Sequence, residues 1–213
     1  MRTAVCARLQ HMPPRFVALQ LSRPEGFLGH LIRLLMNRHN ARMNAFAVRL
    51  LDLAPSDRVL EIGFGGGVTL TSLIGRASFV GGVDRAPDVV AWAKNKFAHA
   101  VQAGVADFRE GSVDAIPFEP ASFSKVCTVN TVYFWPSLDS GFAEIRRVLS
   151  PGGRAVVGFL PKDRMDRGKF PADIFTSRAP EEVVGALTRA GFQQVRVERP
   201  APSTPWNVIV ATR

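Results

Sequence analysis

Short apolar runs alternate with helical patterns along most of the chain, and this alternation predicts the fold class. Short apolar runs bounded by turn residues are typical of buried strands, whereas apolar side chains at three- and four-residue spacing indicate helices. We expect strands over 58–63, 79–84, 105–109, 125–130, 154–160, 194–198 and 207–211, and helices over 68–74, 87–101, 138–149 and 180–190. Strands that alternate with helices form a mostly parallel sheet with helices on both faces, so the class is α/β.

The N-terminal quarter has a different pattern. Apolar side chains recur at near-helical spacing over 26–51, which predicts helix there. We expect 1–26 to be a poorly ordered basic extension, 27–52 to be a helical cap and 53–213 to be the main domain. A chain of 213 residues, 46% of them hydrophobic, suits one domain with such an appendage.

Charge is spread unevenly along the chain. The formal net charge is +9, and residues 1–50 supply +7 of it, with eight arginines against the single acid Glu25. Such a segment can attract an anionic substrate, nucleic acid or a lipid surface. A solvated basic face without a partner is the interpretation we favour, because charge by itself does not identify a partner.

Several classes of protein are excluded. No apolar run approaches the roughly 20 residues that a membrane-spanning helix needs. The two cysteines, Cys6 and Cys127, lie far apart, and no Cys/His spacing suits zinc. We therefore expect a cytoplasmic protein without a metal site, in which Cys127 is a core thiol.

A glycine-rich turn follows the first predicted strand. Its sequence is Val59-Leu60-Glu61-Ile62-Gly63-Phe64-Gly65-Gly66-Gly67. Glycines allow positive φ and let a ligand approach the backbone, although a tight turn alone would also use them. No Gly-Lys-Ser/Thr follows, so the turn is not a P-loop.

Asp84 ends the second predicted strand, where a carboxylate can accept hydrogen bonds from both hydroxyls of a ribose. A helix cap ahead of Pro87 is the structural alternative. Dinucleotides and S-adenosylmethionine both carry a ribose, so Asp84 does not distinguish between them.

Four segments together resemble the class I S-adenosylmethionine-dependent methyltransferases, especially the compact bacterial group similar to the ubiquinone and menaquinone biosynthesis enzymes. They are 61–70, 82–87, 111–118 and 147–154, and the likeness extends over about 27–213. The resemblance implies a Rossmann-like fold with a seven-stranded sheet whose last strand is antiparallel. It also implies S-adenosylmethionine as cofactor, with its ammonium group on Glu61 and its ribose on Asp84. The predicted cofactor-binding residues are Glu61, Gly63, Phe64, Gly65, Gly67, Asp84, Arg85, Ser112, Val113 and Asn130.

Two segments depart from the motifs of related enzymes. The family usually has an acid where Ser112 stands, and a serine hydroxyl can still accept a hydrogen bond but offers less reach and no charge. After the fourth predicted strand, Asn130 and Tyr133 match the outer letters of the Asn-Pro-Pro-Tyr motif of amino-group methyltransferases, but neither proline is present. We expect Tyr133, Phe134 and Trp135 to shape an apolar acceptor pocket, although aromatic side chains also serve as core.

The predicted helical cap over 27–52 supplies the remaining candidate residues for binding the methyl acceptor. His39 and Asn40 lie in a stretch that covers the acceptor site in related enzymes, and His39 is a candidate general base. A lone surface histidine is the ordinary alternative. Because the methyl group of the cofactor is already activated, transfer mainly requires alignment, so we assign no catalytic residue.

Three functions remain open at this stage. We favour transfer to a small-molecule acceptor, because the segment after the fourth strand is aromatic and no nucleic-acid module is appended. An RNA or protein methyltransferase that uses the basic N-terminal region for recognition is the alternative. A methyltransferase-like domain that only binds a ligand is a third, since fold does not guarantee chemistry. The sequence does not predict an oligomeric state.

Overall fold

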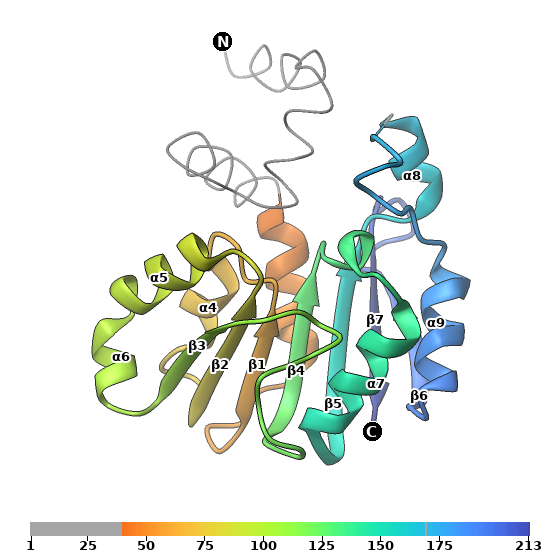
Figure 1. Cartoon of the computed structure of the whole chain (residues 1–213). Helices are drawn as coiled ribbons and strands as arrows, with labels where there is room; N and C mark the ends of the chain where they lie inside the picture. The colour runs from red at the N-terminus through yellow and green to blue at the C-terminus, as the bar shows by residue number, and fades with distance from the viewer. Residues whose placement is uncertain (1–39, 169) are drawn as a thin grey trace.

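A seven-stranded sheet with strand order β3-β2-β1-β4-β5-β7-β6 forms the centre of the molecule (Figure 1). This computed structural model describes residues 40–168 and 170–213. The strands are β1 (Arg58–Ile62), β2 (Phe79–Asp84), β3 (Ala106–Glu110), β4 (Phe123–Val129), β5 (Leu149–Phe159), β6 (Gln193–Glu198) and β7 (Asn207–Thr212). Strand β7 pairs antiparallel with β5 and β6, and the other neighbours pair in parallel. The predicted Rossmann-like sheet with an antiparallel last strand is confirmed.

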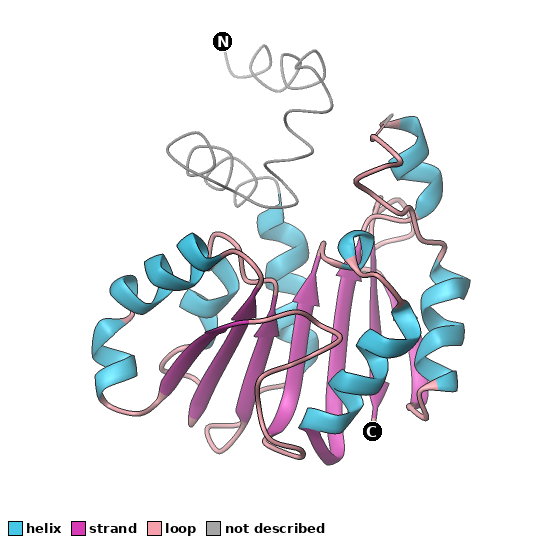
Figure 2. Cartoon of the chain, in the orientation of Figure 1, coloured by secondary structure: helices cyan, strands magenta, loops and turns pink. Residues whose placement is uncertain are grey.

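Helices cover both faces of the sheet (Figure 2). They are α4 (Val68–Leu73), α5 (Pro87–Lys96), α6 (Ala98–Gln102), α7 (Leu138–Val148), α8 (Lys162–Arg167) and α9 (Pro180–Arg189), together with the short 3-10 helix η1 (Val132–Phe134) and helical residues 40–51. Buried side chains of α4, α5 and 40–51 pack in one core layer, and those of α7 and α9 pack in the other.

Strand residues serve both layers because successive side chains point to opposite faces. Val156 and Val208 pack with the helix at 40–51, whereas their chain neighbours Val157 and Ile209 pack with α7 and α9. Both faces of the central strands are therefore apolar, which is why these strands were recognisable as continuous apolar runs.

The helix at 40–51 belongs to the core as well as to the edge of the sheet. Met43, Phe46 and Leu51 are buried, and the Phe46 ring centroid lies 5.6 Å from that of Trp206. The Arg154 guanidinium of β5 donates a hydrogen bond of 3.1 Å to the Leu50 carbonyl near the end of this helix. The rest of the expected cap and the whole expected extension lie outside the described residues.

The structure corrects some predicted boundaries. The helix expected over 87–101 is divided into α5 and α6 at Phe97, whose backbone leaves the helical region with φ −109° and ψ 29°. Its ring packs 5.7 Å from Phe108 and 6.4 Å from Trp92, so burial of the aromatic ring outweighs helical continuity. Strand β5 begins at Leu149 rather than at residue 154. The sequence did not predict α8 or η1, which are too short to show a period.

Candidate functional site

A cavity of about 370 Å³ opens at the carboxyl ends of β1 and β4. Strand β1 leads on to β2 and β3 on one side, and β4 and β5 lie on the other, so this is the point where the strand order reverses. Open α/β sheets bind ligands at that point. The cavity is lined by twelve of the predicted site residues: Asn40, Glu61, Gly63, Phe64, Gly65, Asp84, Arg85, Ser112, Val113, Asn130, Tyr133 and Trp135. Gly67 is not part of the lining, and His39 lies outside the described residues.

The glycine turn between β1 and α4 has three left-handed residues, which explains its composition. Gly63, Gly65 and Gly67 have φ of 68°, 45° and 66°. A Cβ on Gly63 would collide with the Thr131 methyl group, and one on Gly67 would come within 2.8 Å of the Trp92 ring. A Cβ on Gly65 would meet no protein atom within 4 Å. Gly63 and Gly67 are therefore required by the fold, whereas Gly65 keeps its backbone open to the cavity.

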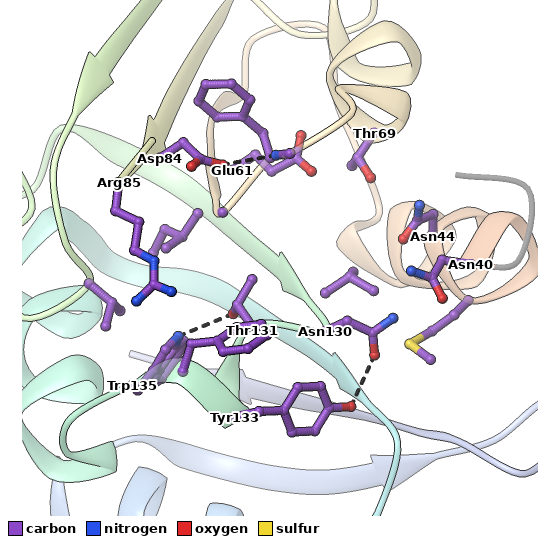
Figure 3. A pocket seen from close by; sticks show the side chains of 18 of the residues that line it. Asn40, Asn44, Glu61, Thr69, Asp84, Arg85, Asn130, Thr131, Tyr133 and Trp135 are labelled. Carbon is purple, nitrogen blue, oxygen red and sulfur yellow. Dashed lines mark hydrogen bonds between the residues drawn. The ribbon is translucent and has the colours of Figure 1, made fainter. Parts of the chain in front are cut away.

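Asp84 holds the glycine turn from the end of β2. Its carboxylate accepts a hydrogen bond of 2.9 Å from the Gly65 amide (Figure 3). It accepts another of 3.0 Å from the Ala86 amide. The residue is 8% exposed and lines the cavity. Asp84 thus fixes the backbone ahead of α5 but does not cap that helix, whose N-cap is Ala86 without a side-chain hydrogen bond.

Glu61 is a buried carboxylate at the end of β1 with capacity for a further partner. It is 5% exposed, and among the described residues no group donates a hydrogen bond to its Oε2 atom. Burial, with a smaller contribution from the negative charge of Asp84, raises the pKa of Glu61 to about 8, although hydrogen bonds from Thr69 and Leu70 oppose the shift. A buried carboxylate of this kind is costly unless a cation or donor pairs with it.

Ser112, Val113 and Arg85 form one side of the cavity. The Gly111 amide donates a hydrogen bond of 3.1 Å to the Asp84 carbonyl, which brings the segment after β3 next to the end of β2. Val113 is buried. The Arg85 guanidinium lies 5.5 Å from the centroid of the Phe134 ring, so it spans from the end of β2 toward the segment after β4 (Figure 3).

The segment after β4 supplies the opposite wall. The Tyr133 hydroxyl donates a hydrogen bond of 3.0 Å to Asn130 Oδ1, and the Trp135 indole donates one of 3.2 Å to the Thr131 hydroxyl (Figure 3). The Thr131 hydroxyl also bonds that of Thr128. Tyr133 and Trp135 are almost fully buried, so they present ring surface to the cavity and are themselves part of the core.

Several lining residues were not recognised in the sequence. They are Met43, Asn44, Ile62, Gly66, Val68, Thr69, Val83, Gly111, Val129, Thr131, Pro136, Leu160, Met165, Phe170, Phe175, Pro205 and Trp206. Phe134, which was expected in the pocket wall, lines the cavity as well. Asn44 could have been found, because it lies one helical turn after Asn40. Five more come from α8, the loop that follows it and the β6–β7 connection, and no local motif connects those segments with the glycine turn: Met165, Phe170, Phe175, Pro205 and Trp206.

The described residues show neither a metal-binding cluster nor a membrane-spanning helix. Within 40–168 and 170–213, no three His, Cys, Asp or Glu side chains are grouped so that they could hold a metal ion. In the same part of the chain, no helix has the length and apolar character needed to cross a membrane.

The sheet order, the glycine turn and the two carboxylates together have the architecture of class I methyltransferases. Comparison with known proteins agrees: residues 60–157 match the methyltransferase domain family. The uncharacterized methyltransferase YdaC of Bacillus subtilis is 27% identical over 169 residues, which make up 77% of this chain and 87% of that protein. A ubiquinone/menaquinone biosynthesis C-methyltransferase of Geotalea daltonii is 29% identical over 115 residues, 53% of this chain and 49% of that enzyme.

Solved structures show the same fold. A complex of the Haloferax volcanii Trm112 methyltransferase activator and a putative methyltransferase aligns with a TM-score of 0.69 at 17% identity, covering 84% of this chain and 92% of that chain. An S-adenosylmethionine-dependent methyltransferase from Mesorhizobium loti aligns with a TM-score of 0.67 at 17% identity, covering 79% and 96%. Residues 60–157 thus match a methyltransferase domain, and the comparisons together support a class I S-adenosylmethionine-dependent methyltransferase. The chain spans most of the Bacillus protein but only about half of the Geotalea enzyme.

Proposed function

We propose that this protein transfers the methyl group of S-adenosylmethionine to a small, largely apolar molecule that binds in the same cavity. The observation that carries the proposal is the combination in one cavity of two buried carboxylates, Glu61 and Asp84, with a wall of apolar and aromatic side chains. The carboxylates suit the charged and hydroxylated parts of the cofactor, and the apolar wall suits an acceptor.

The residues present fit the cofactor at three points. Oε2 of Glu61 can accept a hydrogen bond from the ammonium of the methionine moiety, which would stabilise the carboxylate form. The carboxylate of Asp84 lines the cavity at the end of β2, and a carboxylate is a suitable acceptor for two ribose hydroxyls. The open space over Gly65 lets the ligand lie against the backbone. We assign the adenine to Ser112 and Val113 beside the end of β3.

The acceptor would occupy the side of the cavity farther from these carboxylates. Tyr133 and Trp135 line it together with Leu160, Met165 and Phe175. Thioether and aromatic side chains adapt to apolar ligands of varied shape. Asn40 of the helix at 40–51 contributes a polar group to the same cavity.

The cofactor supplies a methyl group on a positively charged sulfur, which is activated for in-line displacement. The protein then needs to align the acceptor atom with that methyl group and to keep water away. Buried Tyr133 and Trp135 serve both purposes, because their rings are held in place by hydrogen bonds. The account requires no general base, and we assign none.

Methyl transfer from radiolabelled S-adenosylmethionine to a pool of small metabolites and to total RNA tests this proposal. We expect label in the small-molecule fraction with the natural protein and, at a cofactor concentration that does not saturate it, much less with the Asp84→Ala variant. The alternative is an RNA methyltransferase that uses the basic residues 1–50, and phosphate contacts would make its binding fall steeply with salt. Label confined to RNA, with salt-sensitive RNA binding, would favour that alternative.

A further inference from the structure

We propose that Asn130 selects an acceptor that presents an oxygen atom, because Tyr133 holds the Asn130 amide with its N–H groups available to the cavity and its oxygen occupied. This inference rests on the proposed function and specifies its acceptor. The ligand class is an apolar molecule with a phenol, enol or carboxylate oxygen near the atom that is methylated. Amines are disfavoured, because the single lone pair of an amine nitrogen must face the methyl group and its N–H groups would find no acceptor on Asn130, whereas an oxygen has a second lone pair for the Asn130 donor.

The hydrogen bonds of Tyr133 determine how the amide is oriented. The Leu160 amide donates to the Tyr133 hydroxyl, so the hydroxyl proton is free to be donated elsewhere. Its candidate acceptors are Asn130 Oδ1 at 3.0 Å and the Leu160 carbonyl at 3.4 Å. The shorter contact is the stronger hydrogen bond. Asn130 therefore directs Oδ1 to the phenol, and Nδ2 with its two N–H donors lies on the other side.

Burial keeps the Tyr133 side chain in place, and Tyr133 in turn keeps the Asn130 amide in this orientation. The residue is 4% exposed, and its ring lies 6.1 Å from each of the Phe134 and Phe175 rings, centroid to centroid. Burial also raises the pKa of the Tyr133 phenol far above its usual value, so the hydroxyl keeps its proton at neutral pH. A protonated phenol in a fixed ring is a constant donor to Asn130.

The backbone of Asn130 is fixed as well. Its φ of 59° is left-handed, a conformation that asparagine tolerates better than most residues. Its backbone N–H donates a hydrogen bond of 2.8 Å to the Gly158 carbonyl of β5. The left-handed backbone by itself would account for an asparagine here, but it would not determine which end of the side-chain amide faces the cavity.

The surroundings of the amide nitrogen are polar on one side and apolar on the other. Figure 3 shows the Asn130 nitrogen directed toward the side of the cavity where Asn40 and Asn44 lie, and all three asparagines line the cavity. Leu160, Met165 and Phe175 line it nearby. An acceptor molecule can therefore bury an apolar body while one oxygen accepts from Asn130.

Three matched ligands test the inference on protein saturated with S-adenosylhomocysteine. They are p-cresol, p-toluidine and toluene, which differ only in the hydroxyl, amino or hydrogen substituent. We expect NMR titration to give p-cresol an affinity about tenfold above that of p-toluidine. The p-cresol oxygen accepts a hydrogen bond from Asn130, whereas p-toluidine leaves that donor unsatisfied. Toluene should bind without sensitivity to Asn130.

Two variants distinguish an effect on the orientation of the Asn130 side-chain amide from a general structural effect. Asn130→Asp keeps the shape, the tolerance of left-handed backbone and the acceptor for Tyr133, but it removes the N–H donors, so it should reverse the preference between p-cresol and p-toluidine. Tyr133→Phe frees the amide to rotate, so the ratio of the two affinities should fall toward one. Asn95→Asp on the exposed face of α5 is the matched control for added charge and should change nothing.

The outcomes distinguish this inference from the proposed function. Failure of the natural protein to bind S-adenosylhomocysteine would contradict the proposed function itself. Binding of S-adenosylhomocysteine with equal or tighter binding of p-toluidine, or with no binding of any of the three ligands, would overturn the role of Asn130 alone. Equal weakening of all three ligands by Tyr133→Phe would show that Tyr133 is only structural, and the inference would then fail.

Discussion

The Glu61→Gln variant tests whether the buried carboxylate at the end of β1 pairs with the ammonium group of the cofactor. Burial raises the pKa of Glu61 to about 8, so at pH 7 the unliganded protein holds a proton on this group in about nine molecules of ten. An ammonium partner favours the charged form and lowers the pKa. Binding at pH 7 should therefore release close to one proton.

The sign and size of the pH dependence follow by linkage. Below a pKa of about 8, the cost of removing the proton grows by about 1.4 kcal/mol per pH unit, so affinity should rise about tenfold between pH 6 and pH 7. The stability of the unliganded protein changes with pH in the opposite direction. A carboxyl whose pKa is raised in the folded state is neutral at low pH, and stability falls as pH rises from 4.5 to about 8.

Calorimetry of S-adenosylhomocysteine binding in two buffers with different ionisation enthalpies measures the proton directly. In Glu61→Gln the proton release should disappear, the affinity should become independent of pH and binding at pH 8 should be weaker. Glu181→Gln, on the exposed start of α9, is the matched control and should behave as the natural protein. Heats that do not depend on the buffer, with an affinity that is constant from pH 6 to pH 7 in the natural protein, would refute the pairing of Glu61 with the ammonium.

Four further predictions concern the cofactor site, the core and the N-terminal segment. Asp84→Ala should weaken S-adenosylhomocysteine binding by about 1–3 kcal/mol in calorimetry, and unchanged affinity in a folded variant would show that Asp84 only holds the glycine turn. Gly65→Ala and Gly75→Ala both place a Cβ in open space at positive φ, so both should lower the melting temperature, but only Gly65→Ala should lose affinity; equal affinities would contradict the role of Gly65. Phe142→Ala, at a residue that is 0% exposed, should destabilise the fold by about 3–5 kcal/mol in urea unfolding. Deletion of 1–24 should leave S-adenosylhomocysteine affinity unchanged, and a large loss would place that segment in the cofactor site.

The carboxyl-edge residues could be predicted because their signals are local. Gly63, Gly65 and Asp84 stand at the ends of two apolar strands, where sequence position alone brings them to one edge of the sheet. The same logic found Asn130 at the end of β4. It could not find Thr69, because a threonine in the first turn of a short helix is ordinary, and only the fold brings it into hydrogen-bonding contact with Glu61.

Features that depend on packing between different elements could not be predicted from the sequence. The break at Phe97 results from contacts with Trp92 and Phe108, and the second of these lies on β3. The hydrogen bonds of Tyr133 reach Leu160 at the end of β5, 27 residues along the chain, so the orientation of the Asn130 amide follows from neither motif nor spacing. Helical periodicity and turn residues report on one element at a time, and these contacts join several.

A crystal structure of the protein with S-adenosylhomocysteine tests the central claim most directly. The account predicts the ligand in the cavity between β1 and β4, with its ammonium nitrogen about 3 Å from Oε2 of Glu61 and its ribose hydroxyls at a similar distance from the Asp84 carboxylate. Its sulfur should face the side lined by Asn130 and Tyr133. A ligand bound elsewhere, or bound in reverse with its adenine at Glu61, would contradict the account.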